Sequence, residues 1–304
     1  MQGLVVSLDR GYPLVRTERG EQRAQHAIDL VKNASERAAV GDIVELSGQF
    51  GQDMLQITAI HPRNSILARR ELVESIHEGA GKIKEQILAV NFDFVVVVQS
   101  LGKKPLALDY LERQLVLAHE SGRETLVLLT KADLALHLAE DVAAAQGAAP
   151  SSKVCCLTKT DVAALQELAA LFCPGHLGVL LGRSGVGKST LVNLLAGETK
   201  QAVASVRAKD SAGRHTTVAR RLVDLPGGGA VIDTPGMRAL GVLGCERGLA
   251  STFPEIEAAA GACRYRDCTH THEPGCAVVD AVEAGNIPQR RLESYRLLAA
   301  EVHD

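Results

Sequence analysis

The residues with the most definite chemistry form a glycine-rich run that matches the phosphate-binding pattern G-x-x-x-x-G-K-S/T. The run consists of Gly182, Arg183, Ser184, Gly185, Val186, Gly187, Lys188, Ser189 and Thr190. Glycines allow backbone N–H groups to turn inward around phosphate oxygens, and the start of a helix adds positive potential. We expect Lys188 to reach the β- and γ-phosphates of a nucleotide and Ser189 to ligate Mg²⁺.

The segments on both sides of this run are those that the motif requires. The apolar residues 177–181 predict a buried strand, and residues 191–196 predict a helix. A glycine-rich turn before a helix, without a ligand, is the alternative interpretation. The complete motif between a strand and a helix favours phosphate binding.

A second motif could read the base of the same nucleotide. Residues 130–133 are Thr-Lys-Ala-Asp and resemble the guanine-reading pattern N/T-K-x-D. The Asp133 carboxylate could accept hydrogen bonds from the N1–H and 2-amino groups of guanine, whereas adenine has an acceptor and no amino group there. Lys131 would lie along the base plane, and Thr130 stands where Asn is commoner.

Residues 158–161, Thr-Lys-Thr-Asp, fit the same pattern. They also follow an apolar run, at the position where a GTPase would place its last base-contacting loop. We favour residues 130–133, because the strand predicted before them, 125–129, is longer and more apolar. Either four-residue match, taken alone, could have arisen by chance.

A third motif, D-x-x-G, begins at Asp233 and ends at Gly236, after a predicted hairpin over residues 221–232. Asp233 would hold Mg²⁺ through water, and the Gly236 N–H would meet the γ-phosphate. Ordinary GTPases place the guanine-reading motif after D-x-x-G. Here it precedes the phosphate-binding loop, and residues 237–304 contain no lysine that could supply a later copy. The order therefore predicts a circularly permuted GTPase domain.

The segment before that hairpin, residues 198–217, is polar and rich in turn residues, so we expect a mobile loop. Thr217 at its end, or the neighbouring Thr216, could ligate Mg²⁺ and sense the γ-phosphate. Met237 stands where many GTPases have a water-orienting Gln, so we expect slow hydrolysis unless a partner completes the site. His215 is the best candidate to orient or deprotonate the water, although an ordinary loop histidine fits nearly as well.

A metal-binding pattern, C-x4-C-x-H-x5-C, follows near the C-terminus. Cys263, Cys268, His270 and Cys276 supply three thiolates and an imidazole, the donor set of a closed tetrahedral Zn²⁺ site. Such a site has no open position, so the zinc would be structural. His272 is a possible rival to His270, and free surface thiols are the alternative interpretation.

Composition restricts the classes of protein further. The 33 Lys and Arg against 36 Asp and Glu give a net charge of −3, so RNA contact would need local basic patches. Aromatic residues are 3% of the chain and Trp is absent, which disfavours base stacking as a major mode. The sequence has no long apolar run and no signal-peptide pattern. Its seven cysteines are an odd number, which favours free thiols or metal ligands over a disulfide framework. We expect a cytoplasmic monomer without membrane contact.

Three parts follow along the chain. Residues 1–65 contain short apolar segments that alternate at period two, at 3–8, 12–15, 25–31, 41–46 and 54–60. They predict a small β-barrel of the oligonucleotide-binding (OB) fold, although a structural β module without a ligand fits equally well. Residues 66–245 form the expected permuted α/β GTPase domain, and residues 246–304 form a helical zinc-binding domain.

The combination resembles the RsgA/YjeQ family of ribosome small-subunit-dependent GTPases over nearly the whole chain. The motifs that carry the resemblance are T-K-A-D, G-R-S-G-V-G-K-S-T, G-R-H-T-T, D-T-P-G and C-R-Y-R-D-C-T-H-T-H-E-P-G-C. It implies an OB barrel, a permuted GTPase domain that binds GTP or GDP with Mg²⁺, and a C-terminal zinc domain. It also implies late maturation of the 30S subunit, with rRNA contact and GTP hydrolysis stimulated by the ribosome.

Two other classes of function remain as alternatives. The first is a P-loop ATPase or small-molecule kinase, which the guanine-reading motif disfavours. The second is a zinc-containing RNA-binding scaffold that uses the nucleotide only as a structural ligand. Nucleotide competition distinguishes the first alternative, and multiple-turnover hydrolysis distinguishes the second.

Overall fold

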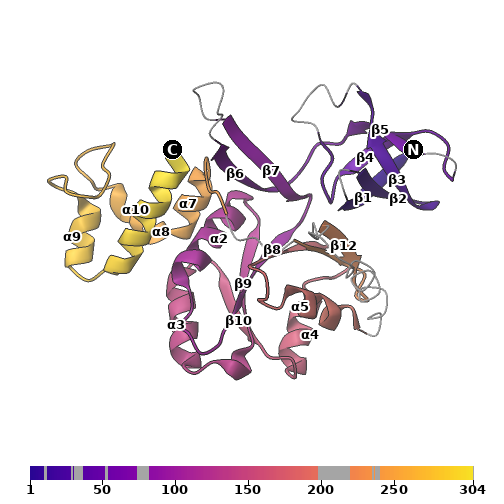
Figure 1. Cartoon of the computed structure of the whole chain (residues 1–304). Coiled ribbons are helices and arrows are strands. Elements are labelled where there is room, and N and C mark those ends of the chain that lie inside the picture. The colour runs from indigo at the N-terminus through magenta and orange to yellow at the C-terminus, as the bar shows by residue number, and fades with distance from the viewer. Residues whose placement is uncertain are drawn as a thin grey trace.

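The structure is a computed structural model, and it describes residues 1–9, 12–28, 30, 37–51, 54–73, 82–197, 220–234, 236 and 240–303. A five-stranded barrel is followed by a central sheet between helices and by a helical C-terminal part (Figure 1). This is the predicted arrangement of the chain. Among the described residues, no helix combines the length and the apolar character needed to cross a membrane.

The barrel consists of β1 (Gln2–Asp9), β2 (Tyr12–Thr17), β3 (Gly20–His26), β4 (Ile43–Ser47) and β5 (Leu55–Ile60). The strands follow the order β1-β2-β3-β5-β4, and β4 pairs with β1 to close the barrel. Strands β3 and β5 are parallel, and the other pairs are antiparallel. This closed five-stranded arrangement is the predicted OB fold.

One strand of the barrel was predicted in the wrong place. The apolar segment 25–31 was expected to be a strand, but β3 ends at His26. The strand contains a single buried side chain, Ala24, so its sequence shows no apolar alternation. Its place depends on backbone hydrogen bonding to β2 and β5, which a hydrophobic pattern does not report.

A two-stranded hairpin, β6 (Ile66–Val73) and β7 (Lys82–Val90), lies between the barrel and the C-terminal helices (Figure 1). The central sheet follows with β8 (Phe94–Ser100), β9 (Glu124–Thr130), β10 (Lys153–Leu157), β11 (Leu177–Leu181), β12 (Arg220–Asp224) and β13 (Ala230–Asp233). Its order is β10-β9-β8-β11-β13-β12, and β12 alone is antiparallel to its neighbour in this sheet. The strands predicted before each motif are confirmed.

Helices cover both faces of this sheet. They are α2 (Leu108–Glu120), α3 (Leu138–Ala148), α4 (Val162–Ala170) and α5 (Lys188–Leu195). The central strand β8 is buried on both faces: Val95 and Val97 pack in the core that contains α2, and Val96 and Val98 pack in the core that contains α5. A strand buried on both sides reads as a continuous apolar run, which is why its sequence was informative.

The barrel and the central sheet are joined by hydrogen-bonded strands. Ser7 of β1 pairs with Arg221 of β12, and Leu8 pairs with Arg220. The Arg16 guanidinium donates to the Asp224 carboxylate at 2.8 Å across the same junction. The two parts therefore form one continuous sheet of eleven strands.

The C-terminal part contains α7 (Glu246–Thr252), α8 (Pro254–Ala260), α9 (Ala277–Glu283) and α10 (Gln289–His303). Helices α7 and α10 pack on α2, where the carboxylate of Glu112 is fully buried. Arg290, Arg291 and Ser294 of α10 donate hydrogen bonds to that carboxylate, at 2.5 to 2.9 Å. Burial alone would raise the pKa of Glu112, but these hydrogen bonds hold it below its usual value.

A buried histidine joins the same two parts. The side chain of His119 in α2 is 8% exposed, and its Nδ1 lies 2.9 Å from the Thr252 hydroxyl. That hydroxyl donates to the Gly248 carbonyl at 2.7 Å, so Nδ1–H is the donor to it. The Ser152 hydroxyl then donates to Nε2 at 3.0 Å. The hydrogen bonds therefore favour the neutral ring, and a second proton would break one of them.

We predict that His119 makes folding sensitive to acid. Burial lowers the pKa of His119 to about 4, from an ordinary value of 6.5. Above pH 6.5 both folded and unfolded chains hold a neutral ring. As the pH falls toward 4 the unfolded chain takes up the proton first, so the free energy of unfolding decreases by up to about 3 kcal/mol. Urea unfolding between pH 7 and 4 should show a smaller loss in His119→Gln, and equal losses would contradict the assignment.

Candidate nucleotide site and metal cluster

The glycine-rich loop connects β11 to α5, as the motif predicts. Gly187 has a φ of +102°, which L side chains rarely adopt. A Cβ at Gly182 would lie 2.6 Å from the Val98 carbonyl oxygen of β8, so glycine is needed there as well. The glycines that identify the motif are therefore the residues that the backbone conformation and packing of the loop require.

The lysine of the loop lies inside it. Lys188 is 6% exposed, and its Nζ donates to the carbonyl oxygens of Gly182 at 2.6 Å and Arg183 at 3.0 Å. Burial lowers the pKa of Lys188, and the nearby Asp233 carboxylate opposes that shift. The loop backbone therefore holds the Lys188 ammonium group, which would add positive charge to a phosphate site.

The guanine-reading motif contacts the phosphate-binding loop directly. The buried Thr130 hydroxyl donates to the Val186 carbonyl at 2.6 Å, and Lys131 Nζ donates to the Gly185 carbonyl at 2.8 Å. Asp133 lies in the short helix η1 (Ala132–Leu134) and is exposed at this edge. The structure therefore brings together residues 130–133 and 182–190, which lie far apart in the sequence.

The second copy of the pattern has a different structural role. Asp161 is the N-cap of α4, and its carboxylate accepts the Ala164 N–H at 3.0 Å. Helix capping is a common role for an aspartate at this position. The copy follows β10, the outermost strand of the central sheet, whereas Thr130 is the last residue of β9.

The D-x-x-G motif lies against the other side of the phosphate-binding loop. β13 ends at Asp233, and the buried Thr234 hydroxyl donates to the Leu180 carbonyl at 2.5 Å. A Cβ at Gly236 would lie only 2.4 Å from the Ser184 nitrogen, so its glycine is required by close approach. Four other residues considered above lie outside the described residues: His215, Thr216, Thr217 and Met237.

One contact of the loop was not foreseen. The Arg183 guanidinium lies over the Tyr110 ring of α2, with its carbon 4.7 Å from the ring centroid. This cation–π contact orients the exposed side of the loop. A lone Tyr in an amphipathic helix gives no local sign of such a contact, so no sequence pattern could have identified it.

The predicted metal ligands converge. The ligand atoms of Cys263, Cys268, His270 and Cys276 all lie within 4.8 Å of one another. His270 Nδ1 is 3.6 Å from the Cys263 sulfur and 3.4 Å from the Cys276 sulfur. Corners of a tetrahedron with metal–ligand bonds of about 2.1–2.3 Å would be about 3.5–3.8 Å apart. The cluster therefore fits one tetrahedral ion.

The backbone and the neighbouring helix fix the histidine of this cluster. His270 has a φ of +58°, in the left-handed region, and its carbonyl oxygen accepts a hydrogen bond from Arg296. The rival ligand His272 is exposed, and its Nδ1 lies 2.9 Å from the Thr271 hydroxyl. His270 is therefore the histidine that faces the thiols.

The fold and these loops define a P-loop nucleotide-binding protein in which β9, which ends in the T-K-x-D motif, precedes β11, which leads to the phosphate-binding loop. A sequence model described as RsgA GTPase matches residues 60–243. A protein named "Small ribosomal subunit biogenesis GTPase RsgA" from Streptomyces avermitilis is 42% identical over 307 residues, covering 99% of this chain and 79% of its own. A protein of the same name from Methanosarcina acetivorans is 40% identical, covering 90% of this chain and 72% of its own.

Two solved structures share the fold. The crystal structure of YjeQ from Thermotoga maritima has a TM-score of 0.69 at 23% identity, covering 99% of this chain and 98% of that one. The structure of YloQ, described as a circularly permuted GTPase, has a TM-score of 0.65 at 23% identity, covering 99% of this chain and 94% of that one. This chain belongs to the RsgA GTPase family, a family of GTP-hydrolysing enzymes.

We predict that the two aspartates of the T-K-x-D copies differ sharply. Asp133→Asn should weaken GTP binding by at least about a hundredfold, because an amide would oppose the 2-amino group of guanine. Asp161→Asn is the matched control, since Asn caps a helix well and should leave GTP affinity unchanged. Titration with a fluorescent GTP analogue measures both. A larger loss in Asp161→Asn would reverse the assignment.

The metal cluster gives a second paired comparison. His270→Ala removes a ligand that faces three thiols and should abolish stoichiometric metal binding, whereas His272→Ala should retain it. Elemental analysis of the purified full-length chains gives the metal content per chain. Retention of metal by His270→Ala together with loss by His272→Ala would contradict the ligand set.

Proposed function

We propose that this chain is a cytoplasmic, Mg²⁺-dependent GTPase that acts in late maturation of the 30S ribosomal subunit and is stimulated by it. The observation that carries the proposal is the pair of hydrogen bonds from Thr130 and Lys131 to the phosphate-binding loop. They fix the guanine-reading motif and the phosphate-binding loop at one edge of one sheet. The names of the relatives support the ribosomal role.

In this proposal each loop contacts one part of the nucleotide. Asp133 accepts the guanine N1–H and 2-amino hydrogens, and Lys131 lies along the base. The loop backbone surrounds the phosphates through Gly182, Arg183, Ser184, Gly185, Val186, Gly187, Lys188, Ser189 and Thr190. Mg²⁺, which neutralises charge between the β- and γ-phosphates, would be held by Ser189 and Thr217 directly and by Asp233 through water. Gly236 would donate its N–H to the γ-phosphate.

Hydrolysis requires an oriented water. His215 remains the proposed candidate, with the ribosomal partner completing the arrangement. An exposed edge formed by η1 and the phosphate-binding loop leaves room for such a partner.

Zinc is the proposed metal of the C-terminal cluster, held by Cys263, Cys268, His270 and Cys276. The chemistry of three thiolates and an imidazole supports Zn²⁺, and four protein ligands leave no position for a substrate. A structural zinc would fix the loop between α8 and α9.

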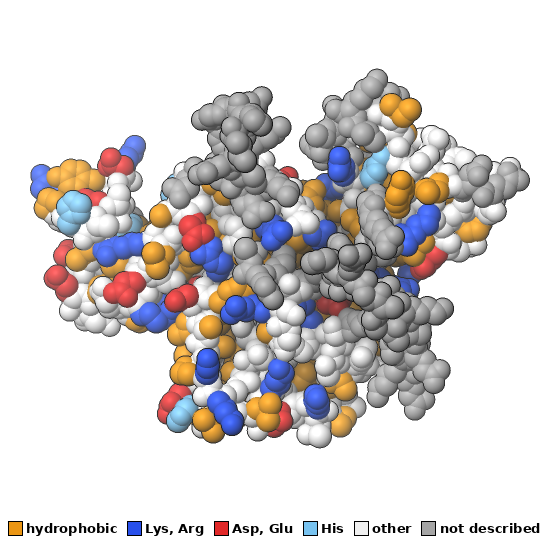
Figure 2. Space-filling model, in the orientation of Figure 1, with side chains coloured by type: hydrophobic (Ala, Val, Ile, Leu, Met, Phe, Trp, Pro, Cys, Tyr) orange, Lys and Arg blue, Asp and Glu red, His pale blue; other side chains and the backbone are white. Residues whose placement is uncertain are grey.

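Contact with rRNA is proposed to involve several parts of the chain rather than one patch. On the face shown in Figure 2, Lys and Arg side chains are spread over the C-terminal helices, the central domain and the barrel, among acidic side chains. Phosphate contacts from separated basic residues give salt-dependent binding without a strongly basic net charge. We retain the division into residues 1–65, 66–245 and 246–304 and expect a monomer.

The proposal is tested by GTP turnover with and without purified 30S subunits. We expect phosphate release over multiple turnovers, faster by at least about tenfold with 30S subunits. Lys188→Ala is the control, because it removes the ammonium group of the loop and should abolish both rates. ATP hydrolysis in place of GTP hydrolysis would indicate the kinase or ATPase alternative. A single turnover without release would indicate the scaffold alternative.

A further inference from the structure

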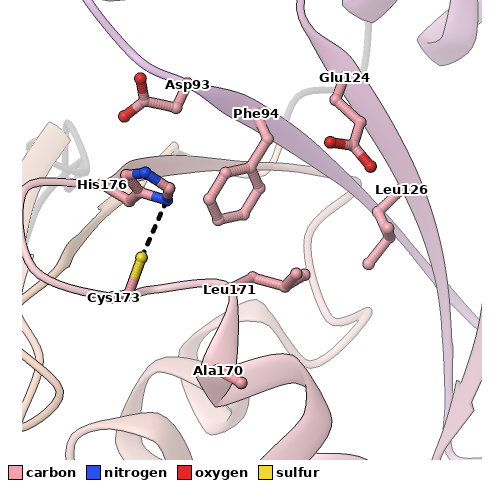
Figure 3. A pocket seen from close by; sticks show the side chains of 8 residues that line it. All are labelled: Asp93, Phe94, Glu124, Leu126, Ala170, Leu171, Cys173 and His176. Atoms are coloured by element: carbon pink, nitrogen blue, oxygen red, sulfur yellow. Dashed lines mark hydrogen bonds between the residues drawn. The ribbon is translucent and has the colours of Figure 1, made fainter.

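A hollow of about 360 Å³ lies at the opposite end of the central sheet from the phosphate-binding loop. It opens where β8 and β9 begin and where the connection from α4 enters β11. Its lining residues are Asp93, Phe94, Glu124, Leu126, Ala170, Leu171, Cys173 and His176 (Figure 3). None of the motifs discussed above contributes to it.

The hollow contains a thiol paired with an imidazole. Cys173 Sγ lies 3.2 Å from His176 Nδ1, and Figure 3 shows the thiol directed at the ring, with Phe94 beside both. The cysteine is half-buried and the histidine is exposed, so both are accessible to a small molecule. A base within hydrogen-bond distance of a thiol is the arrangement that activates a nucleophilic cysteine.

The residues that line the hollow determine, by their polarity and charge, which electrophiles could reach the Cys173 thiol. Phe94, Leu126, Ala170 and Leu171 give apolar walls, while carboxylates of Asp93 and Glu124 lie at the upper side in Figure 3. The carboxylates repel anionic reagents, and the walls favour an apolar body. We propose that Cys173 is a modification site for neutral organic hydroperoxides, and that its oxidation is transmitted to the nucleotide site.

The reaction balances with the groups present. His176 Nδ1 takes the proton of the thiol, and the sulfur attacks the terminal oxygen of the hydroperoxide. The S–O bond forms as the O–O bond breaks, and the leaving alkoxide takes the proton back from the imidazolium. The sulfur is oxidised by two electrons to a sulfenic acid, and the hydroperoxide is reduced by two electrons to an alcohol.

The turn that holds the thiol packs tightly against the turn between β12 and β13. A Cβ at Gly229 would lie 2.5 Å from the Phe172 carbonyl oxygen and 2.8 Å from that of Cys173. The Ala230 N–H donates to the His176 carbonyl at 2.9 Å. β13 continues from here to Asp233, and β11 continues to the phosphate-binding loop. The backbone of this turn, which carries the thiol, therefore touches the starts of both strands, so a shift of the turn on oxidation of Cys173 would reach them.

The test uses the full-length, metal-loaded chain and cumene hydroperoxide, with a cyclic diketone to trap sulfenic acid and mass spectrometry to locate it. Cys173 should be trapped at least about tenfold faster than Cys155, which is also half-buried and lies in β10. His176→Gln should reduce the rate at Cys173 by at least about tenfold. Equal rates at the two cysteines, or an unchanged rate in His176→Gln, would overturn the site.

Transmission to the nucleotide site rests on the proposed function and is measured separately. Release of a fluorescent GDP analogue should become at least about twofold faster after oxidation of the wild-type chain, and should not change in Cys173→Ser treated in the same way. An unchanged release rate after complete trapping at Cys173 would overturn the transmission. Failure of the untreated chain to bind GDP would instead contradict the proposed function.

Discussion

Two carbonyl oxygens of the phosphate-binding loop, those of Val186 and Gly185, accept hydrogen bonds from the end of a strand that comes much earlier in the chain. These bonds fix the distance between the part of the site that would hold a base and the part that would hold phosphates. They depend on the neighbouring positions of β9, β8 and β11 in the sheet, and not on the order in which the chain visits them. A permuted chain can therefore build the same site.

The permutation also changes which part of the chain adjoins the strands of the nucleotide site. β12 pairs with β13 of the central sheet on one side and with β1 of the barrel on the other. The ion pair of Arg16 and Asp224 crosses the same junction. A backbone ladder is stiffer than a linker, so a displacement of β12 would be shared with the barrel rather than absorbed between the two parts.

The sequence predicted those features that depend on residues close together in the chain. The phosphate-binding loop, D-x-x-G and the metal ligands each lie within a short segment, and the continuous apolar run of β8 marks a strand buried on both faces. Features that join distant segments were not predictable: the contact of Arg183 with Tyr110, and the place of Cys173 beside β12 and β13. The position of strand β3 was predicted wrongly for another reason: a strand with one buried alanine has no alternation of apolar residues.

Helix α2 contacts both the phosphate-binding loop and the C-terminal helices. Tyr110 lies under the Arg183 guanidinium, while Glu112, two residues further, anchors the C-terminal helices through Arg291 and its neighbours. Because a buried carboxylate cannot lose these partners without a large penalty, α10 and the helices packed with it are held to α2. A force on the C-terminal helices would therefore be transmitted through α2 to Tyr110 and the Arg183 side chain of the phosphate-binding loop.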